Sequence, residues 1–209
     1  MDMNDHPVTF EVERPERFDR AHVFLRLLIL IAASILVAFG WLVALIYLVI
    51  PVLSAAFVSR DGSDRFMTDT APRVKRYLHW IVSADAYFAF LTDRIPVDGP
   101  EAASRMEIAF DGKPTVGSAL LRLLTSIPSA FVLALLGAVA TITGVIAGVM
   151  ILLREDYPQP LYSFHAAVVR WLARLLAYHA SLTDQYPPFA LDGGAPDERQ
   201  PAPPAEQAA

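Results

Sequence analysis

Two long apolar runs, residues 27–59 and 123–153, dominate the chain, and neither contains Asp, Glu, Lys or Arg. A membrane-spanning helix needs about 20 apolar residues to cross a hydrocarbon core of roughly 30 Å. A hairpin inside either run would have arms too short to cross, and its turn would expose backbone to lipid. We therefore expect one transmembrane helix per run, shortened near its ends by Pro51 and Pro128.

Short segments of alternating apolar and polar residues precede both runs. Residues 8–12 read Val-Thr-Phe-Glu-Val, and residues 106–110 read Met-Glu-Ile-Ala-Phe. A period of two is typical of a half-buried strand. The sequence therefore predicts one short strand at the start of each half of the chain.

The two halves share further features in the same order. An arginine embedded in leucines lies at the edge of each run, at Arg26 and at Arg122. Each half ends in Leu-Thr-Asp followed by proline, which places Asp93 and Asp184 at equivalent positions. The same spacing aligns Trp80 with Trp171 and Tyr87 with Tyr178. Several matches in one register indicate a duplication.

This repetition predicts the domain organisation. Residues 1–96 form a first repeat, residues 97–104 a joint, and residues 105–190 a second repeat. Residues 191–209 are rich in Pro, Ala and polar residues and are expected to be a disordered tail. The expected fold is a mainly α integral membrane protein. Each repeat would hold a short N-terminal strand, a long transmembrane helix and an amphipathic or membrane-embedded helix.

The amphipathic helices are predicted from stripes of apolar residues spaced by three and four. The stripe of the first repeat contains Tyr77, Trp80, Ala84, Tyr87 and Leu91, and that of the second contains Phe164, Val168, Trp171, Leu175, Tyr178 and Leu182. Arg and His residues lie off both stripes. Such a helix either lies in the headgroup layer or packs against the spanning helices with its charges in water. The sequence leaves both interpretations open.

Composition favours a membrane protein over a soluble one. Hydrophobic residues make up 55% of the chain and charged residues only 19%, whereas soluble domains are near a quarter charged. The net charge of −5 argues against a nucleic-acid-binding surface. Without cysteine there is neither a disulfide nor a thiolate metal site. A cleaved signal is not expected, because the first apolar run is longer than a signal core and follows a charged leader.

Four segments resemble a bacterial membrane family known as domain of unknown function 4389. They are residues 13–20, 121–128, 170–174 and 182–189. The resemblance covers most of residues 8–190 and is clearest in the second repeat. The first repeat departs from it by replacing the Tyr-Pro-Pro-Phe ending with Ile-Pro-Val-Asp at residues 95–98. The resemblance implies a membrane protein and supplies neither an activity nor a ligand.

Candidate polar residues gather on the second amphipathic segment. His165, Arg170, Arg174 and His179 form a possible polar path or interfacial face. His165 and His179 lie 14 residues apart, about 21 Å along a helix, and so cannot share a metal ion. Asp93 and Asp184 form a repeated turn motif, which either fixes the turn before proline or makes a polar contact between repeats or with a partner. We predict no catalytic, cofactor-binding or metal-binding residue.

The second apolar run carries a predicted helix-packing face. Gly137, Thr141, Gly144 and Gly148 are spaced by four, three and four residues, and small residues on one helix face allow close helix contact in membranes. At the edges of the runs, the long side chains of Arg26 and Arg122 are expected to reach lipid phosphates. Neither run contains a charge that could relay ions or protons.

These patterns predict a multi-pass protein of the inner (cell) membrane, with two or four crossings. Four crossings would place both strands on one side, where they could pair. The expected role is non-enzymatic, structural or accessory, through helix association. The partners would be the lipid bilayer, further copies of the chain or another membrane protein, and not nucleic acid. The alternative is a small transporter or channel subunit.

Overall fold

The computed structural model describes residues 7–12, 15, 19–37, 41–96, 99–102 and 104–191, with side chains described outside residues 29–46. The chain is mainly helical. Its elements, in order, are β1 (Val8–Glu11), α1 (Arg20–Val37), α2 (Trp41–Asp61), α3 (Ser63–Arg65), a π-helical turn (Phe66–Thr70), α4 (Ala71–Phe88), a 3-10 turn (Pro100–Ala102), β2 (Arg105–Ile108), α5 (Val116–Thr125), α6 (Ile127–Arg154) and α7 (Gln159–His179). Residues 192–209 of the predicted tail lie outside the described residues.

In the first apolar run the structure describes α1 and α2, which end and begin on either side of residues 38–40, and these three residues lie outside the described part of the chain. The expectation that Pro51 would shorten this run was wrong, because Pro51 lies inside α2, which continues to Asp61. Proline lacks the N–H group that would bond the carbonyl four residues earlier, here that of Tyr47. The ring of His179 lies 2.8 Å from that carbonyl through Nε2 and replaces the missing donor.

The second run begins its long helix where proline predicted. The α6 helix starts at Ile127 with Pro128 in its first turn, a position where the missing N–H has no helical partner to lose. Just before it, α5 opens with a capping box in which Thr115 and Ser118 exchange side-chain and backbone hydrogen bonds. Ser126 joins the two helices, so the second run includes the end of α5 and nearly all of α6.

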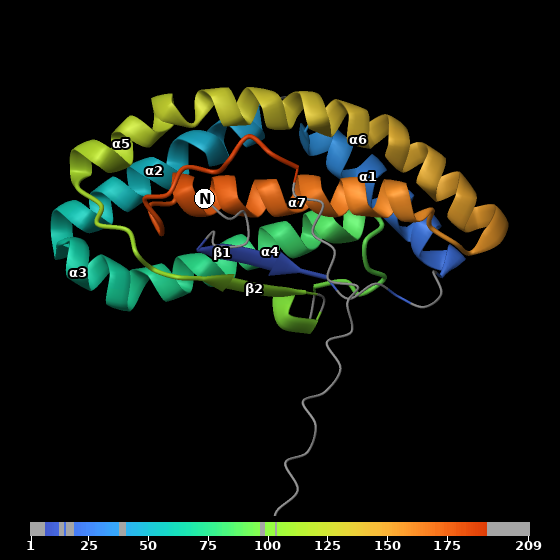
Figure 1. The fold of residues 1–209 in the computed structure, drawn as a ribbon, viewed down its shortest axis with the longest axis horizontal. Helices are drawn as coiled ribbons and strands as arrows, with labels where there is room; N and C mark the ends of the chain where they lie inside the picture. Colours follow the sequence, from blue (N-terminus) through green and yellow to red (C-terminus); the bar gives the residue numbers. More distant parts are fainter. Residues whose placement is uncertain are drawn as a thin grey trace, which may run out of the picture.

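The helices form stacked layers along one long axis (Figure 1). The α5 and α6 helices arch over α7 in one layer, together with α1, which packs against α6, and α2, which packs against α5. Beneath them α7 packs against α4. The two-stranded antiparallel sheet of β1 and β2 covers this pair on the side away from α6, with β1 against α7 and β2 against α4.

The two short strands are confirmed by the structure. They pair antiparallel, with Val8 opposite Ile108 and Phe10 opposite Met106. These four side chains are buried and their neighbours along each strand are exposed, as the alternating pattern predicted. Strands that start the two halves of the chain are thus side by side.

The two predicted amphipathic helices are also present, as α4 and α7. The second lies at the centre of the molecule, and its apolar and off-stripe residues are both buried: Trp171 is 4% exposed and His165 is 2% exposed. By contrast, Tyr77 and Trp80 of α4 are exposed. The α7 helix thus packs against α4 and α6 inside the protein, and its predicted position in the lipid-headgroup layer stays a prediction.

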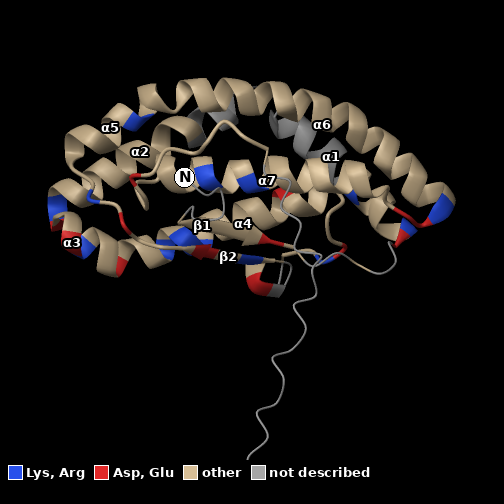
Figure 2. Ribbon diagram, viewed as in Figure 1, with Lys and Arg blue, Asp and Glu red and all other residues tan. Residues whose placement is uncertain are grey.

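Exposed apolar side chains cover the outer surface of α6. They follow one face at steps of three and four: Ile127, Phe131, Leu135, Val139, Ile142, Ile146, Val149 and Leu153. Exposed apolar residues of α1, α2 and α5 extend this surface, and we call the whole the apolar face. Charged residues lie at the two ends of the molecule, along the two strands, on α4 and α7, and at one point on α5 (Figure 2).

Among the described residues, α6 is the one helix whose length and composition suit a membrane crossing. Few of its residues are buried inside the protein, unlike those of a core helix in a soluble domain. The multi-pass arrangement gains no support from any other helix in the described ranges.

Candidate functional site

A buried arginine lies near each end of the layered helices. Arg26 of α1 is fully buried, and its guanidinium donates through Nη2 to the carbonyl of Thr92 and to the carboxylate of Asp93, at 2.9 Å. The guanidinium also lies over two rings, with Cζ 4.3 Å from the centroid of Tyr87 and 4.7 Å from that of Phe90. Cation–π contacts of this kind stabilise a desolvated guanidinium.

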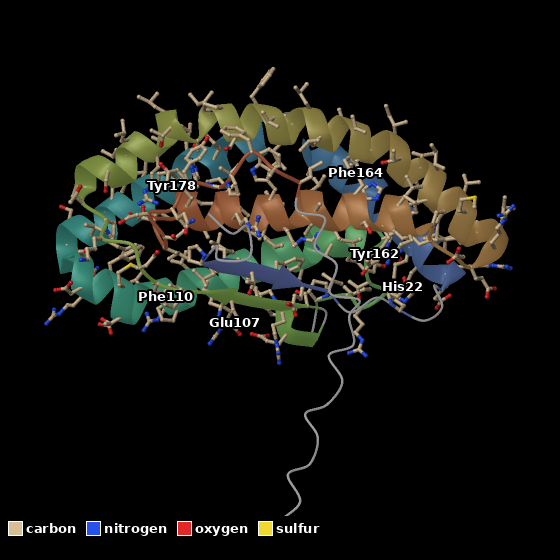
Figure 3. All side chains as sticks on the ribbon, in the orientation of Figure 1. His22, Glu107, Phe110, Tyr162, Phe164 and Tyr178 are labelled. Atoms are coloured by element: carbon tan, nitrogen blue, oxygen red, sulfur yellow. The ribbon has the colours of Figure 1, made fainter. Side chains whose placement is uncertain are left out.

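Arg122 of α5 has a closely similar environment at the other end. Its Nη1 donates to the carbonyls of Tyr178 and Thr183, and its Nη2 to the carboxylate of Asp184. Its Cζ lies 4.5 Å from the centroid of the Tyr178 ring. Figure 3 shows Tyr178 towards one end of the long axis and His22 towards the other. His22 is hydrogen-bonded to Tyr87, whose ring lies under the Arg26 guanidinium.

The structure corrects the expectation that Arg26 and Arg122 reach lipid phosphates. Arg122 is only 4% exposed, and both guanidinium groups bond loops inside the protein. A buried cation needs a local counterion and acceptors, and the Leu-Thr-Asp segments supply both. Each arginine thus ties the start of an apolar helix to the loop that ends its half of the chain.

The loops that receive these arginines have the same backbone conformation. At the end of α4 the N–H of Leu91 bonds the carbonyl of Ala86, and at the end of α7 the N–H of Leu182 bonds that of Ala177. The residue before each, Phe90 or Ser181, has a positive φ, of 61° and 64° respectively. This is a helix C-terminal motif that usually uses glycine. Here it turns a carbonyl and a carboxylate towards the arginine.

Asp93 and Asp184 therefore do more than shape a local turn. Besides the arginine, Asp93 accepts from the N–H of Asp19 at 2.8 Å, and Asp184 accepts from the N–H of Lys113 at 2.8 Å. The local turn bonds instead come from threonine side chains, which accept from the N–H groups of Arg94 and Gln185. Both aspartates bond within their own half of the chain.

The two histidines of the predicted polar path are held by separate sets of partners. His165 contacts the Tyr157 hydroxyl through Nδ1, and its Nε2 lies 2.9 Å from the Ala140 carbonyl. His179 uses Nε2 towards α2 and lies 3.1 Å from the Ser126 hydroxyl through Nδ1. Burial lowers the pKa of both imidazoles, so both are neutral at pH 7.

Arg174 is buried and Arg170 is half-buried on α7, between the two histidines. Of these four candidates, His165 alone is among the described residues that line the cavity described next. The polar path therefore stays a prediction, as does the interfacial face.

A cavity of about 700 Å³ lies between α1, α4, α6 and α7. Its described lining is mainly aliphatic and aromatic, with three ionisable residues among them: Arg26, Asp85 and His165. Ligand pockets in proteins typically have this volume and this mixture of apolar walls and a few polar groups. We call it the α6 cavity.

The predicted helix-packing face lines this cavity. Gly137, Thr141, Gly144 and Gly148 all contribute to its wall. A Cβ atom at Gly148 would lie 3.4 Å from the Phe90 ring, and one at Gly144 would lie 3.9 Å from Nε2 of His165. A Cβ at Gly137 would meet no atom within 4 Å. Packing of this face against another chain stays a prediction, while inside the molecule the small residues leave open space.

Asp85 is the unusual group of the cavity. Among the described residues its carboxylate forms neither a hydrogen bond nor an ion pair, and burial raises its pKa to about 6. A perturbed carboxyl in a pocket is a candidate functional group. The sequence offered a signal for it, since Asp85 is a charge in an otherwise apolar stretch of α4, but not its place beside α6.

Among the described residues, no group of three or more His, Asp and Glu side chains lies close enough together to hold a metal ion. The sequence alone did not reveal the arginine–aspartate pairs, because the partners lie 67 and 62 residues apart. The repeated Leu-Arg-Leu-Leu and Leu-Thr-Asp segments were the available signal. Recurrence of both, in the same order, could have suggested that they meet.

With this geometry in place, comparison with known proteins adds one finding. Residues 117–190 match the family described as Domain of unknown function (DUF4389). The match begins in α5 and ends after the Arg122-binding loop, so it includes Arg122, Asp184 and the whole of α6 and α7. The resemblance to DUF4389 predicted from the sequence is thus confirmed for this segment. No curated protein and no solved structure matches the chain.

Proposed function

We propose that this protein is a non-enzymatic membrane protein with a structural or accessory role, which inserts its apolar face into one side of the lipid bilayer. The observation that carries the proposal is the separation of surfaces: α1, α2, α5 and α6 expose apolar side chains, whereas most charges lie at the ends, along the two strands and on α4 and α7 (Figure 2). Soluble monomers rarely expose a continuous apolar surface of this extent.

The position of the two-stranded sheet favours insertion of the apolar face over a helix that crosses the bilayer. Glu107 of β2 is exposed and pairs with Lys75 of α4 at 2.8 Å. The two-stranded sheet lies beside the middle of α4 and α7, not beyond their ends (Figure 1). If the long axis stood across the bilayer, these charges would enter hydrocarbon, at about 2.5–3.5 kcal/mol for each charge. Insertion of the apolar face keeps them in water.

The proposed duplication fits the same picture. We infer that the two halves arose as copies, because the Arg26–Asp93 and Arg122–Asp184 pairs, the loops that hold them and the paired strands correspond. Each copy would supply one apolar helical arm and one strand. Two copies side by side would produce an extended apolar layer, with a two-stranded sheet on the opposite side of the molecule. This arrangement suits a scaffold at the membrane surface.

The first test is membrane attachment. A protein held by its apolar face should stay in the membrane fraction after carbonate or high-salt washing and dissolve only with detergent. The replacement of Ile142 and Ile146 on the apolar face by Asp should release it, whereas replacing exposed Glu107 and Asp64 by Ala should not. Release of the unaltered protein by salt alone would contradict the proposal.

The second test distinguishes face insertion from crossing. Because the chain has no cysteine, single cysteines at Asp64, Glu107 and Gln159 can be labelled without background. Asp64 and Gln159 lie towards opposite ends of the long axis (Figure 1). Face insertion predicts that a membrane-impermeant maleimide labels all three from the same side. Labelling of Asp64 and Gln159 from opposite sides would show a crossing.

A further inference from the structure

The α6 cavity is elongated. Its wall on α6 extends from Leu133 to Leu152, about 28 Å at the helical rise. Gly137 leaves room along this wall, because a Cβ atom there would meet no atom within 4 Å. An extended apolar chain therefore fits the space better than a compact ring system does.

The Asp85 carboxylate is not balanced by any other charge of the cavity wall. Arg26, on α1, is already paired with Asp93, outside the cavity lining. His165, on α7, is neutral and has both ring nitrogens engaged. The part of α6 that lines the cavity carries no charge. Among the described lining residues the site therefore carries one unpaired negative charge, on the half-buried Asp85, which is unfavourable beside apolar walls.

The fold does not need an acid at this position. The spacing that aligns Trp80 with Trp171 and Tyr87 with Tyr178 places Leu176 opposite Asp85. Leu176 lies in α7, which has the same C-terminal loop motif as α4. An aliphatic side chain at the equivalent position is thus compatible with the same local structure. Folding therefore does not explain why a carboxylate is present at Asp85.

We propose that the α6 cavity binds a lipophilic cation, with an extended apolar chain along α6 and one protonated amine paired with the Asp85 carboxylate. A fatty acid would bring a second negative charge to the site, and an uncharged alkane would leave Asp85 unpaired. A protonated amine supplies the missing charge and donates charge-assisted hydrogen bonds. The pKa of Asp85, raised to about 6 by burial, fits a carboxylate that lacks a partner until the amine arrives.

The ligand can reach the cavity through the apolar face. Leu27, Val145 and Val149 line the cavity and are also exposed on that face. An amphiphile that has partitioned into lipid would therefore meet the entrance directly. The binding site itself does not depend on membrane insertion, so failure of the proposed function and failure of this inference are separate results.

The test compares three probes with the same chain: dodecylamine, dodecanol and dodecanoate. Binding to the full chain in neutral-detergent micelles is measured by titration calorimetry against empty micelles. Dodecylamine should bind at least about tenfold more tightly than the other two, because a charge-assisted hydrogen bond in a buried site is worth that factor or more. Equal binding of all three, or no binding, would overturn the proposal.

Variants locate the effect. Asp85→Asn keeps the shape and removes the charge, so the preference for the amine should disappear, whereas Asp64→Asn, at an exposed acid on α3, should keep it. Asp85→Leu copies the residue at the equivalent position and should behave as Asp85→Asn does. An amine preference that survives both replacements would refute the role of Asp85, and loss of helical circular dichroism in both would show a structural role instead.

Two further arms test the cavity and its charge. Gly137→Leu places a side chain in open space of the wall and should weaken binding of all three probes without loss of helical signal. The amine preference should also fall as pH drops below about 6, because Asp85 then takes up a proton. The other ionisable residues in the described cavity lining are Arg26, which stays charged and paired with Asp93, and His165. Binding of the amine that is insensitive to both changes would place it elsewhere.

Discussion

The two buried ion pairs, Arg26–Asp93 and Arg122–Asp184, make similar contacts but have different surroundings. At the Arg122 end, the ring of Tyr47 stacks on His179 with centroids 4.5 Å apart, and its hydroxyl donates to the carbonyl of Leu123. At the Arg26 end, Gly148 of α6 lies next to the Phe90 ring, and both residues line the α6 cavity. One end is filled by aromatic rings and hydrogen bonds, and the other is left open. The comparison separates what holds the fold together from what is available for a ligand.

Hydrogen bonding differs in the same direction. The Arg122 guanidinium donates to two carbonyls and a carboxylate. In the Arg26 guanidinium, Nε and Nη1 are buried without a hydrogen-bond partner in the described part of the chain. Desolvation without compensation reduces the net stability that a buried ion pair contributes. Arg122 should therefore contribute more to folding than Arg26.

The largest expected effect comes from replacing each pair as a whole. Arg122→Met with Asp184→Asn leaves the Thr183 carbonyl without its donor and removes one of the donors to the Tyr178 carbonyl, and it should lower the free energy of unfolding by about 2–3 kcal/mol. Arg26→Met with Asp93→Asn leaves the Thr92 carbonyl without its donor but also removes two buried guanidinium nitrogens that lack partners among the described residues, so it should lower the free energy of unfolding by only about 1 kcal/mol. Chemical unfolding followed by circular dichroism measures both. A larger loss at the Arg26 end would reverse the comparison.

Asp85 should give a stability effect that depends on pH. Its pKa in the folded protein, about 6, lies above its ordinary value of 3.8, so the folded state binds the proton more tightly. Stability from this group is full below pH 3.8 and is lost as pH rises through 6. Asp85→Asn mimics the protonated form.

Without ligand, Asp85→Asn should therefore be more stable than the unaltered protein by about 2 kcal/mol at pH 7 and equal to it at pH 3.5. Unfolding midpoints measured across this pH range check the difference. A variant that is less stable at pH 7 would show that the carboxylate has a stabilising partner.

A smaller effect should separate the two ends of the glycine face. Gly148→Leu must displace the Phe90 ring, next to which a Cβ would already lie at 3.4 Å, and should destabilise the fold by about 1–2 kcal/mol. Gly137→Leu and the exposed Val145→Leu should change stability by less than about 0.5 kcal/mol. If all three variants instead lower oligomer content equally, the face packs against another chain.

The sequence predicted the elements better than their contacts. Alternation in residues 8–12 and 106–110 identified both strands, because one face of a strand must be apolar to be buried. Apolar spacing identified α4 and α7 for the same reason. The burial of Arg26 was not predictable from its neighbours alone, since the acceptors that permit it come from a loop near Asp93.

Pro51 illustrates the limit most clearly. A proline in a helix normally marks an end because the carbonyl four residues earlier loses its donor. Here the donor is His179, which is 132 residues away from the acceptor, Tyr47, in the chain. Sequence periodicity describes local structure and cannot show such a compensation. The α6 cavity was missed for a related reason, because small residues look alike whether they pack against a helix or border a space.

The most direct test of the account is the depth of α6 in the membrane. Spin labels at Phe131, Ile142 and Leu153, all on the apolar face, report their depth through relaxation by lipid-soluble oxygen and a water-soluble nickel complex. Insertion of the apolar face predicts the same shallow depth at all three positions. A profile in which Ile142 is deepest, with Phe131 and Leu153 near opposite surfaces, would show that α6 crosses the bilayer and would contradict the account.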